Sequence, residues 1–161
     1  MSVINLLNER LQNKWSFDTT MKIQDEMIPA MIEGKDIVAE SPTGSGKTLA
    51  FMLPILNKVD GSKKKTQALV VAPSQELAMQ IVEVIRQWTE GTDITVQQLI
   101  GGANSARQIE KLKKKPTIVV GTPGRLNELI RQGKLKLKDV QTVVLDECDQ
   151  LLSRENRVVV K

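Results

Sequence analysis

A glycine-rich loop is the first place in the sequence where side chains could act on a phosphate. It reads T-G-S-G-K-T over residues 43–48 and follows the apolar stretch D-I-V-A-E at 36–40. Glycines let the backbone approach phosphate oxygens, and the amides that open the next helix point at the anion. The pattern predicts that the loop holds a nucleotide, with a cation near its phosphates and a hydroxyl for Mg²⁺. The predicted nucleotide ligands are Thr43, Gly44, Ser45, Gly46, Lys47 and Thr48, of which Thr48 would also hold Mg²⁺.

Ser41 departs from the strict phosphate-loop pattern, which has a glycine at that place. Serine is small, and only the later glycines must approach the phosphates closely. The alternative is an ordinary Gly/Ser turn in front of an amphipathic helix.

An acidic strand end supplies the second half of the predicted site. The stretch V-V-L-D-E-C-D at 143–149 ends an apolar run in two acids. Asp146 would hold Mg²⁺ through its water shell, and Glu147 would orient and deprotonate the attacking water. Histidine is absent from the chain, so Cys148 has no histidine to activate it and is expected to be a buried spacer. The alternative for the acids is a plain acidic loop.

Short apolar stretches alternate with longer amphipathic ones, which predicts an α/β domain. Both phosphate-directed motifs then fall at the carboxyl ends of parallel strands, where open α/β sheets bind ligands. Ser74 is a predicted N-cap, and Pro123 and Gly133 are expected near the two ends of a helix. The buried face of the helix predicted at 74–88 would consist of Leu77, Ile81, Val84, Ile85 and Trp88. The expected strands are 36–40, 67–73, 95–101, 117–121 and 142–147, several of them buried on both faces, and the expected helices are 47–56, 74–88, 105–115 and 123–133.

The first 33 residues are expected to form helices ahead of that α/β core. Leu6, Leu7 and Leu11 would share one helix face, and Pro29 should kink or restart the second helix. We expect residues 1–161 to form one domain, with residues 34–161 as its core.

Charge and composition limit the kinds of molecule that the chain is expected to bind. The net charge is +4, and lysines cluster at 63–65, at 113–115 and at 134, 136 and 138. These clusters suit a polyanion, although solvated loops would look the same. Only two Trp, two Phe and no Tyr are present, so a nucleic acid would be held by its backbone. One cysteine, no signal sequence and no run long enough to span a bilayer favour a reducing, cytoplasmic setting.

Five motifs in order give residues 15–152 a resemblance to the first RecA-like domain of the DEAD-box RNA helicases. S-P-T-G-S-G-K-T (41–48) resembles motif I, in which the family carries alanine rather than glycine at Ser41. D-E-C-D (146–149) resembles motif II, with Cys148 for alanine. P-S-Q-E-L-A (73–78) resembles motif Ia, Gly101-Gly102 the GG motif, and T-P-G-R (122–125) motif Ib.

The resemblance implies an RNA site as well as a nucleotide site. The residues that it assigns to the RNA sugar-phosphate backbone are Pro73, Glu76, Gly101, Gly102, Thr122, Pro123, Gly124 and Arg125. Gln75 replaces the usual arginine of motif Ia, which removes one charged contact. F-D-T-T-M-K-I-Q (17–24) resembles a Q motif without its prolines, in which Phe17 packs on adenine and Gln24 reads the adenine edge. The alternative for this pair is a buried phenylalanine and a surface glutamine.

The implied function is the N-terminal ATP-binding domain of an ATP-dependent RNA helicase, which couples ATP hydrolysis to RNA unwinding or remodelling. ATP, Mg²⁺, RNA and a second RecA-like domain are the expected partners of a monomeric, cytoplasmic protein. Lys47, Asp146 and Glu147 would be catalytic. Motif III and the second domain are missing from the 161 residues, so the sheet is expected to be incomplete after motif II and the fragment nearly inactive. A P-loop kinase or other nucleotide hydrolase and a non-enzymatic RNA-binding module are the alternatives.

Overall fold

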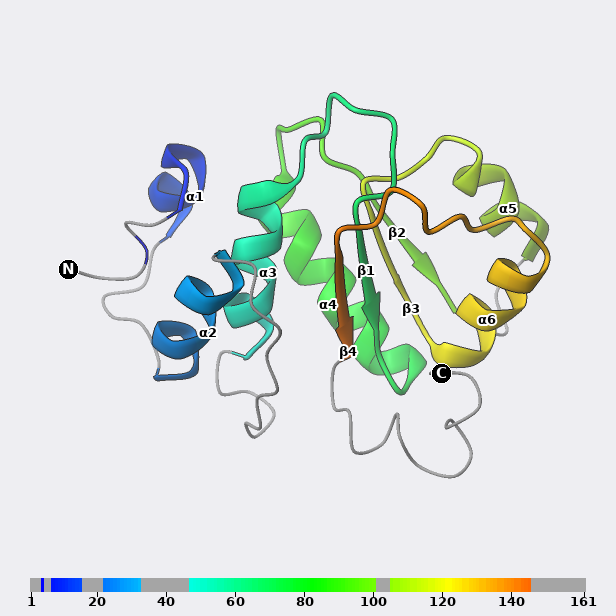
Figure 1. Cartoon of the computed structure of the whole chain (residues 1–161), viewed down its shortest axis with the longest axis horizontal. Helices are drawn as coiled ribbons and strands as arrows, with labels where there is room; N and C mark the ends of the chain where they lie inside the picture. Colours follow the sequence, from blue (N-terminus) through cyan, green and yellow to red (C-terminus); the bar gives the residue numbers. More distant parts are fainter. Residues whose placement is uncertain (1–3, 5–6, 16–21, 33–46, 101–104, 146–161) are drawn as a thin grey trace. The chain divides into compact units, whose positions relative to one another are not determined.

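The computed structural model describes residues 4, 7–15, 22–32, 47–100 and 105–145 (Figure 1). Its chain contacts divide into two compact units, residues 1–59 and 60–161, which are described separately. The predicted strand at 36–40 lies outside the described residues. No helix in the described ranges is both long and apolar enough to cross a membrane.

The first unit is helical where it is described. Its elements are α1 (Glu9–Lys14), α2 (Lys22–Ile32) and α3 (Lys47–Lys58), and α2 packs against α3. Asn8 caps α1 by accepting a hydrogen bond from the Leu11 amide at 3.0 Å. The Lys58 ammonium donates to the Met31 carbonyl at 2.8 Å and so ties the end of α3 to α2. Leu7 and Leu11 are buried, as their spacing predicts.

Pro29 lies inside α2, which continues through it to Ile32 as a single helix. Of the two effects predicted for Pro29, a kink or a restart, the restart does not occur, and the kink stays a prediction. A proline removes one backbone hydrogen bond to the preceding turn, and packing of an apolar face can offset that loss in a helix this short. Pro54 is likewise accommodated within α3.

The second unit is built on a sheet of four parallel strands in the order β2-β3-β1-β4. The strands are β1 (Ala68–Val71), β2 (Val96–Leu99), β3 (Ile118–Gly121) and β4 (Thr142–Leu145). The helices between them are α4 (Gln75–Thr89), α5 (Ser105–Leu112) and α6 (Pro123–Arg131). Strand and helix alternate along the chain, which confirms the predicted α/β class and each of these elements to within a few residues.

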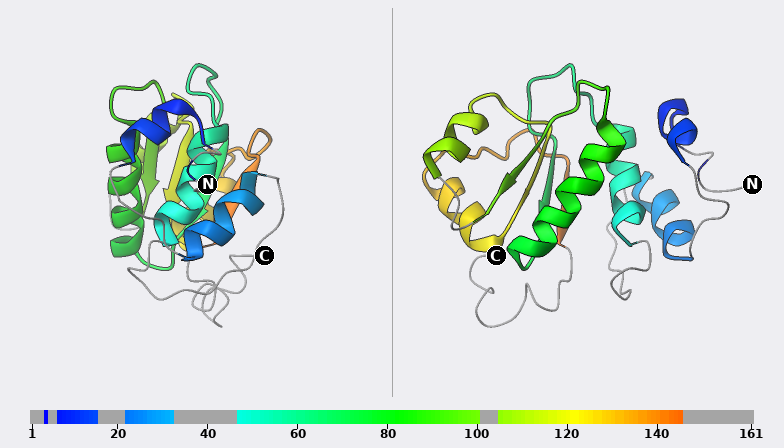
Figure 2. Two further views of the ribbon diagram at one scale, coloured as in Figure 1. Left: turned by 90° about the vertical axis from the view of Figure 1, so that its left-hand side faces the viewer. Right: turned by 180° about the vertical axis from the view of Figure 1, so that it is seen from behind.

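Helices cover both faces of this sheet (Figures 1 and 2). On one face, α5 and α6 pack over alternate strand residues around Leu69 and Val119. α4 crosses the other face and contacts β2 and β3. The core under α5 and α6 consists of Leu69, Val71, Leu99, Leu112, Val119, Leu126, Leu129 and Leu135.

The buried face of α4 differs from the expected one by part of a turn. Ile81, Ile85 and Trp88 are buried as predicted, whereas Leu77 and Val84 are only half-buried. Ala78 and Val82 take their places in the core. The face of α4 that packs on the sheet is thus the one that includes Ala78, Ile81, Val82 and Ile85.

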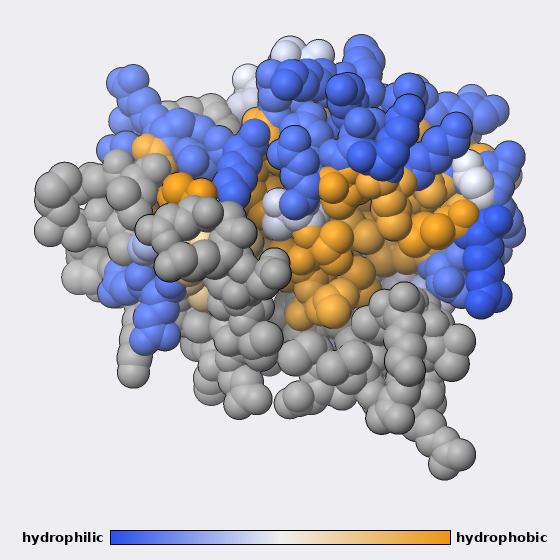
Figure 3. All heavy atoms as spheres, viewed as in Figure 1, coloured by the Kyte–Doolittle hydropathy of each residue, from blue (hydrophilic) through white to orange (hydrophobic). Residues whose placement is uncertain are grey.

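β4 is less buried than an apolar strand of a parallel sheet should be. Val143 is 56% exposed and Leu145 is 40% exposed, and Figure 3 shows hydrophobic surface over this strand and the segment before it. Both residues lie level with β1 residues, Val143 beside Leu69 and Leu145 beside Val71. β4 has β1 on one side and no strand among the described residues on the other. Of the predicted strands, β1 and β3 are buried along their whole length, whereas β4 is not, which agrees with the expectation that the sheet is incomplete on this side.

Candidate nucleic-acid interface

Two helices begin next to each other at the carboxyl edge of the sheet. β1 leads through Ala72 into α4, and β3 leads through Thr122 into α6. The two strands are neighbours, with Val71 level with Gly121, and the Ala72 amide extends the ladder by donating to the Gly121 carbonyl at 2.9 Å. The first amides of a helix have no acceptor within the helix and attract anions. The sheet order thus brings two such helix ends to one place.

The two helix starts differ in how they are capped. The Ser74 hydroxyl accepts from the Leu77 amide at 3.1 Å, which confirms Ser74 as the N-cap of α4. Thr122 occupies the N-cap position of α6 in extended conformation but makes no capping hydrogen bond through its side chain. Pro123 follows in the first turn, as predicted, and that turn contains no acidic residue. The α6 start is thus the less satisfied of the two.

An open pocket of about 540 Å³ lies between these helix starts. Motif Ia and motif Ib residues line it together, although they are some 50 positions apart in the sequence. Its lining residues are Pro73, Ser74, Gln75, Thr122, Gly124, Arg125 and Glu128.

Arg125 is the cation in the described lining of this pocket. Its side chain is only 10% exposed, and its Nη1 lies 3.9 Å from Glu128 Oε2, at the outer limit of an ion pair. Arg125 Nε is buried and has no hydrogen-bond partner among the described residues. A buried guanidinium with unused donors is costly unless an anion pairs with it. The geometry is therefore that of a site for a phosphate or carboxylate group.

Glycine at position 121 sets the place where the chain leaves β3 for α6. A Cβ there would meet the Leu99 carbonyl oxygen at 2.6 Å and the Leu126 side chain at 2.8 Å. The Thr122 amide meanwhile donates to that same Leu99 carbonyl at 3.2 Å. Close packing at Gly121 thus fixes the position of Thr122 and of the α6 start.

Two buried glutamines hold the segment that leads to the GG motif. Gln108 of α5 donates through Nε2 to the Ile100 carbonyl at 3.1 Å. Gln97 of β2 donates to the Gln108 carbonyl at 2.8 Å. Both side chains are almost fully buried. This pair of glutamines therefore holds Ile100, the last described residue of this segment.

The structure brings together four of the predicted RNA-binding residues, Pro73, Thr122, Gly124 and Arg125, in the lining of one pocket. Pro123 is buried beside them, and Glu76 is exposed in the first turn of α4 but does not line the pocket. Gly101 and Gly102 lie outside the described residues. Glu128 was not predicted; its position three residues after Arg125 on a helix was the signal that could have found it.

The nucleotide site falls largely outside the described residues. This holds for Phe17, Thr43, Gly44, Ser45, Gly46, Asp146 and Glu147, and for Cys148. Lys47 and Thr48 open α3, whose first turn contains no acidic residue, as a helix that faces phosphates requires. Gln24 lies in α2 and is 3% exposed. Among the described residues there is no cluster of three or more Cys, Asp or Glu that could hold a metal.

A family model for the DEAD/DEAH box helicase matches residues 21–161. Two bacterial relatives are named "Probable ATP-dependent RNA helicase YfmL" from Bacillus subtilis and "DEAD-box ATP-dependent RNA helicase CshC" from Bacillus cereus. The first is 48% identical over 94% of this chain and the second 49% identical over 90%. The chain spans 41% and 38% of the length of these two relatives.

Solved structures give the same result. A DEAD box protein from Methanococcus jannaschii matches 96% of the chain with a TM-score of 0.90 at 33% identity, and the chain covers 43% of it. A hypothetical ATP-dependent RNA helicase from Sulfolobus tokodaii matches 96% with a TM-score of 0.86 at 32% identity, with 45% of that protein covered. The parallel sheet therefore has the RecA-like fold of these proteins. With motif Ia and motif Ib brought to one pocket and the family model matching from residue 21 onward, the chain belongs to the DEAD/DEAH box helicase family.

Proposed function

We propose that this chain is the first RecA-like domain of an ATP-dependent RNA helicase and that it holds the RNA sugar-phosphate backbone at the carboxyl edge of its sheet. The pocket between α4 and α6 is the observation that carries the proposal. It combines two helix N-termini with a nine-tenths buried arginine whose Nε has no described partner. Backbone amides and an arginine recognise phosphate without reading a base, which suits a helicase that acts on many sequences.

The nucleotide would bind at the start of α3. Lys47 and Thr48 are the described residues there, and Thr43–Gly46 would complete the cradle. Phe17 and Gln24 would select adenine. Mg²⁺, held by Thr48 and by Asp146 through water, would neutralise charge on the phosphates. Glu147 would orient and deprotonate the attacking water.

The whole protein would act through a second RecA-like domain that supplies the rest of the RNA clamp and an arginine finger. Arginine fingers contribute roughly 10³-fold or more to the turnover of related nucleotide hydrolases, so the 161 residues alone should hydrolyse ATP very slowly. The relatives' names support this assignment, and their bacterial origin supports action in the cytoplasm. We propose a monomer. A small-molecule kinase would use the phosphate loop but would leave the motif Ia and motif Ib pocket without a role.

RNA binding by Arg125→Ala tests the central proposal. Fluorescence anisotropy with labelled single-stranded RNA should show an affinity loss of about tenfold or more, because a buried charged contact is removed. Arg86→Ala, an exposed arginine of α4, is the control and should bind normally. Equal affinity for Arg125→Ala and the unchanged chain would sink the pocket as the RNA site.

Nucleotide binding is tested separately. Lys47→Ala should abolish Mg-ATP binding, whereas Glu147→Gln should keep binding and stop hydrolysis in the full-length protein. GTP that competes equally with ATP would contradict adenine selection by Phe17 and Gln24.

A further inference from the structure

The lysine clusters noted in the sequence all lie in segments at the edge of the sheet where the strands begin. Each lies in the segment that enters a strand: residues 60–67 enter β1, 113–117 enter β3, and 133–141 enter β4. These three strands are neighbours in the order β3-β1-β4. We call the nine side chains the lysine edge: Lys63, Lys64, Lys65, Lys113, Lys114, Lys115, Lys134, Lys136 and Lys138. All nine are exposed.

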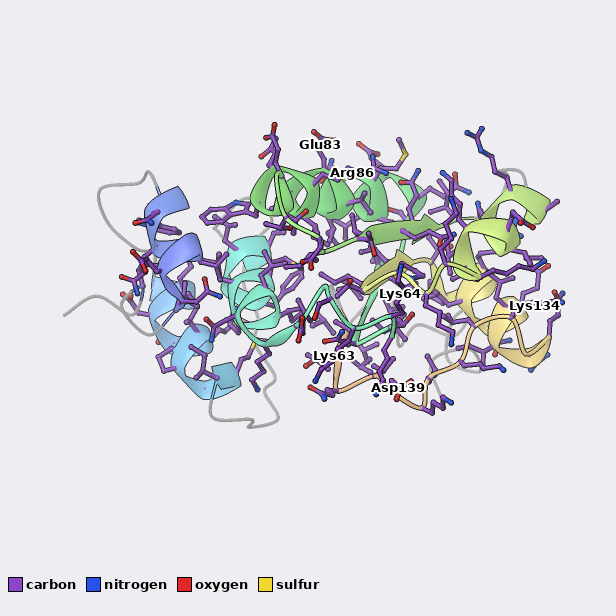
Figure 4. The ribbon with its side chains drawn as sticks, turned by 90° about the horizontal axis from the view of Figure 1, so that it is seen from above. Lys63, Lys64, Glu83, Arg86, Lys134 and Asp139 are labelled. Carbon is purple, nitrogen blue, oxygen red and sulfur yellow. The ribbon has the colours of Figure 1, made fainter. Side chains whose placement is uncertain are left out.

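Backbone hydrogen bonds hold the three segments side by side. The Gln67 amide donates to the Thr117 carbonyl at 2.8 Å, and the Gln141 amide donates to the Gln67 carbonyl at 2.9 Å. The segment before β1 is further fixed, since the Asp60 amide and the Gln67 side-chain carbonyl form one hydrogen bond and the Gln67 Nε2 and Asp60 carbonyl form another. The three segments therefore lie at the amino ends of the strands (Figure 1; Lys63, Lys64 and Lys134 are labelled in Figure 4), whereas the pocket residues follow the carboxyl ends of β1 and β3.

The positive charge of this edge is poorly neutralised. Glu110 pairs with Lys113 at 3.5 Å, and both side chains are about 70% exposed. Asp60 accepts hydrogen bonds from the Ser62 amide and hydroxyl at 3.0 and 2.6 Å. Asp139 is the remaining acid of these segments (Figure 4). No described carboxylate forms an ion pair with the other eight lysines, so most of the charge remains available.

Lys115 adds a sign of strain at this surface. Its φ is 52°, in the left-handed region that glycine and asparagine favour after a helix. Its amide donates to the Leu112 carbonyl at 2.9 Å and so closes the end of α5. Glycine occupies the comparable position after α6, where Gly133 has a φ of 71°. At position 115 the chain carries a positive charge where a glycine would fit with less strain.

We infer that the lysine edge binds the phosphate backbone of a second RNA segment, such as a duplex arm, while the pocket on the opposite edge holds the strand being remodelled. This rests on the proposed function, which makes RNA the protein's polyanion. Lysines bind phosphates as point charges without a preferred base geometry. Among the described large apolar side chains that are exposed, only Leu137 belongs to these segments, which disfavours a membrane surface.

Two sets of triple substitutions (triplets) test this inference, one that removes the lysine charges and one that keeps them. In one set, each cluster is changed to glutamine (Lys63, Lys64 and Lys65→Gln, and likewise for the other two clusters). In the matched set, the same lysines become arginine. Anisotropy is measured with a labelled RNA duplex that carries a single-stranded extension, between about 50 and 200 mM KCl. Circular dichroism confirms that each exposed triplet variant is folded.

Each glutamine triplet should lower the affinity about tenfold or more at low salt. It should also reduce the slope of log affinity against log salt by about two to three, because up to three phosphate contacts are lost. The arginine triplets should bind normally. Glutamine triplets with unchanged affinity and slope would overturn the inference and leave the lysines as a solvated face. Stronger binding of the unchanged chain to phosphatidylserine vesicles or poly-glutamate than to RNA, lost in the triplets, would overturn it as well.

Arg125→Ala in the same assay separates the two proposals. Loss at Arg125 with intact binding in the triplets supports the pocket and rejects the lysine edge. Loss in the triplets with intact binding in Arg125→Ala does the reverse.

The variant Lys115→Gly provides an independent test of the inference. The thermal midpoint should rise because strain is relieved, while the affinity for the duplex probe should fall. A variant that is more stable and binds RNA as well as before would contradict a role for Lys115 at this surface.

Discussion

Arg125 and Glu128 lie one turn apart in α6, with Arg125 Nη1 3.9 Å from Glu128 Oε2 at the pocket wall. The acid is half exposed and the arginine nearly buried. In the proposed RNA site, the negative charge of Glu128 would oppose the approach of a phosphate to Arg125. At 3.9 Å, with the acid open to solvent, the ion pair should contribute little to stability, about 0–1 kcal/mol, so its main effect should be on binding.

Glu128→Gln should therefore strengthen RNA binding, by about two- to fivefold at low salt, because a competing negative charge is removed. The measurement is anisotropy with single-stranded RNA. Glu83→Gln makes the same charge change at an exposed position of α4 (Figure 4) and should have a smaller effect. Equal gains in the two variants would mean that net charge alone matters and that Glu128 has no special place in the pocket.

Gly121→Ala should destabilise the second unit by roughly 1–3 kcal/mol, since the added Cβ overlaps the Leu99 carbonyl and the Leu126 side chain. Chemical denaturation measures the loss. Gly124→Ala is the matched control, because a Cβ there meets nothing within 4 Å and its φ is not left-handed.

For RNA binding, Gly124→Ala is the variant that should have an effect, because Gly124 lines the pocket. Gly124→Ala should keep or slightly raise stability, since alanine favours helix over glycine by up to about 1 kcal/mol, yet weaken RNA binding by obstructing the close approach of a phosphate. A Gly124→Ala variant with unchanged RNA affinity would show that the backbone at this helix start does not contact RNA.

Gln108→Leu should cost about 1 kcal/mol of stability, because the Ile100 carbonyl loses its hydrogen bond in a buried place. RNA affinity should fall by more than the small change in folded fraction explains, since Ile100 precedes Gly101. The two are compared by denaturation and by anisotropy. Gln80→Leu, an exposed glutamine of α4, should alter neither.

Asp60 has a pKa below its ordinary value because the Ser62 hydroxyl and amide donate hydrogen bonds to its carboxylate. A lowered pKa stabilises the folded state above the ordinary pKa, and that contribution is lost as the pH falls through the folded-state pKa. Ser62→Ala should therefore raise the Asp60 pKa toward the ordinary value, as measured by NMR titration. The stability difference between the two chains should be present at pH 7 and vanish in strong acid. An Asp60 pKa that stays low in Ser62→Ala would assign the shift to the Ser62 backbone amide and the charge of Lys63.

The local elements were predictable because their signals are local. Ser74, Pro123 and Gly133 each mark a helix end through their own backbone preferences, and the structure has them in those places. The motifs predict that Pro73 and Arg125 both contact RNA; the structure has both in the lining of one pocket, and the contact with RNA stays a prediction. The family match supports the same prediction from the chain as a whole.

The predictions that failed concern burial, which depends on which segments of the chain are neighbours in space. Val143 and Leu145 look like core residues, and only the position of β4 in the sheet order explains their exposure. Leu77 is half-buried because α4 packs with the face that includes Ala78, and which face that is depends on tertiary packing. Helical spacing predicts that Glu128 lies close to Arg125. The expected competition between Glu128 and a phosphate also depends on the burial of Arg125, which cannot be derived from the sequence.

The strand order has a consequence for how the chain is made. Ala68 in β1 pairs with Ile118 and with Thr142, so its two neighbouring strands follow some 50 and 70 residues later. At synthesis rates of about 5–20 residues per second, β4 is synthesised roughly 4–15 seconds after β1. During that interval the apolar stretch around Leu69 lacks one of its two neighbouring strands. We therefore expect this stretch to be a site at which a chaperone can bind the nascent chain.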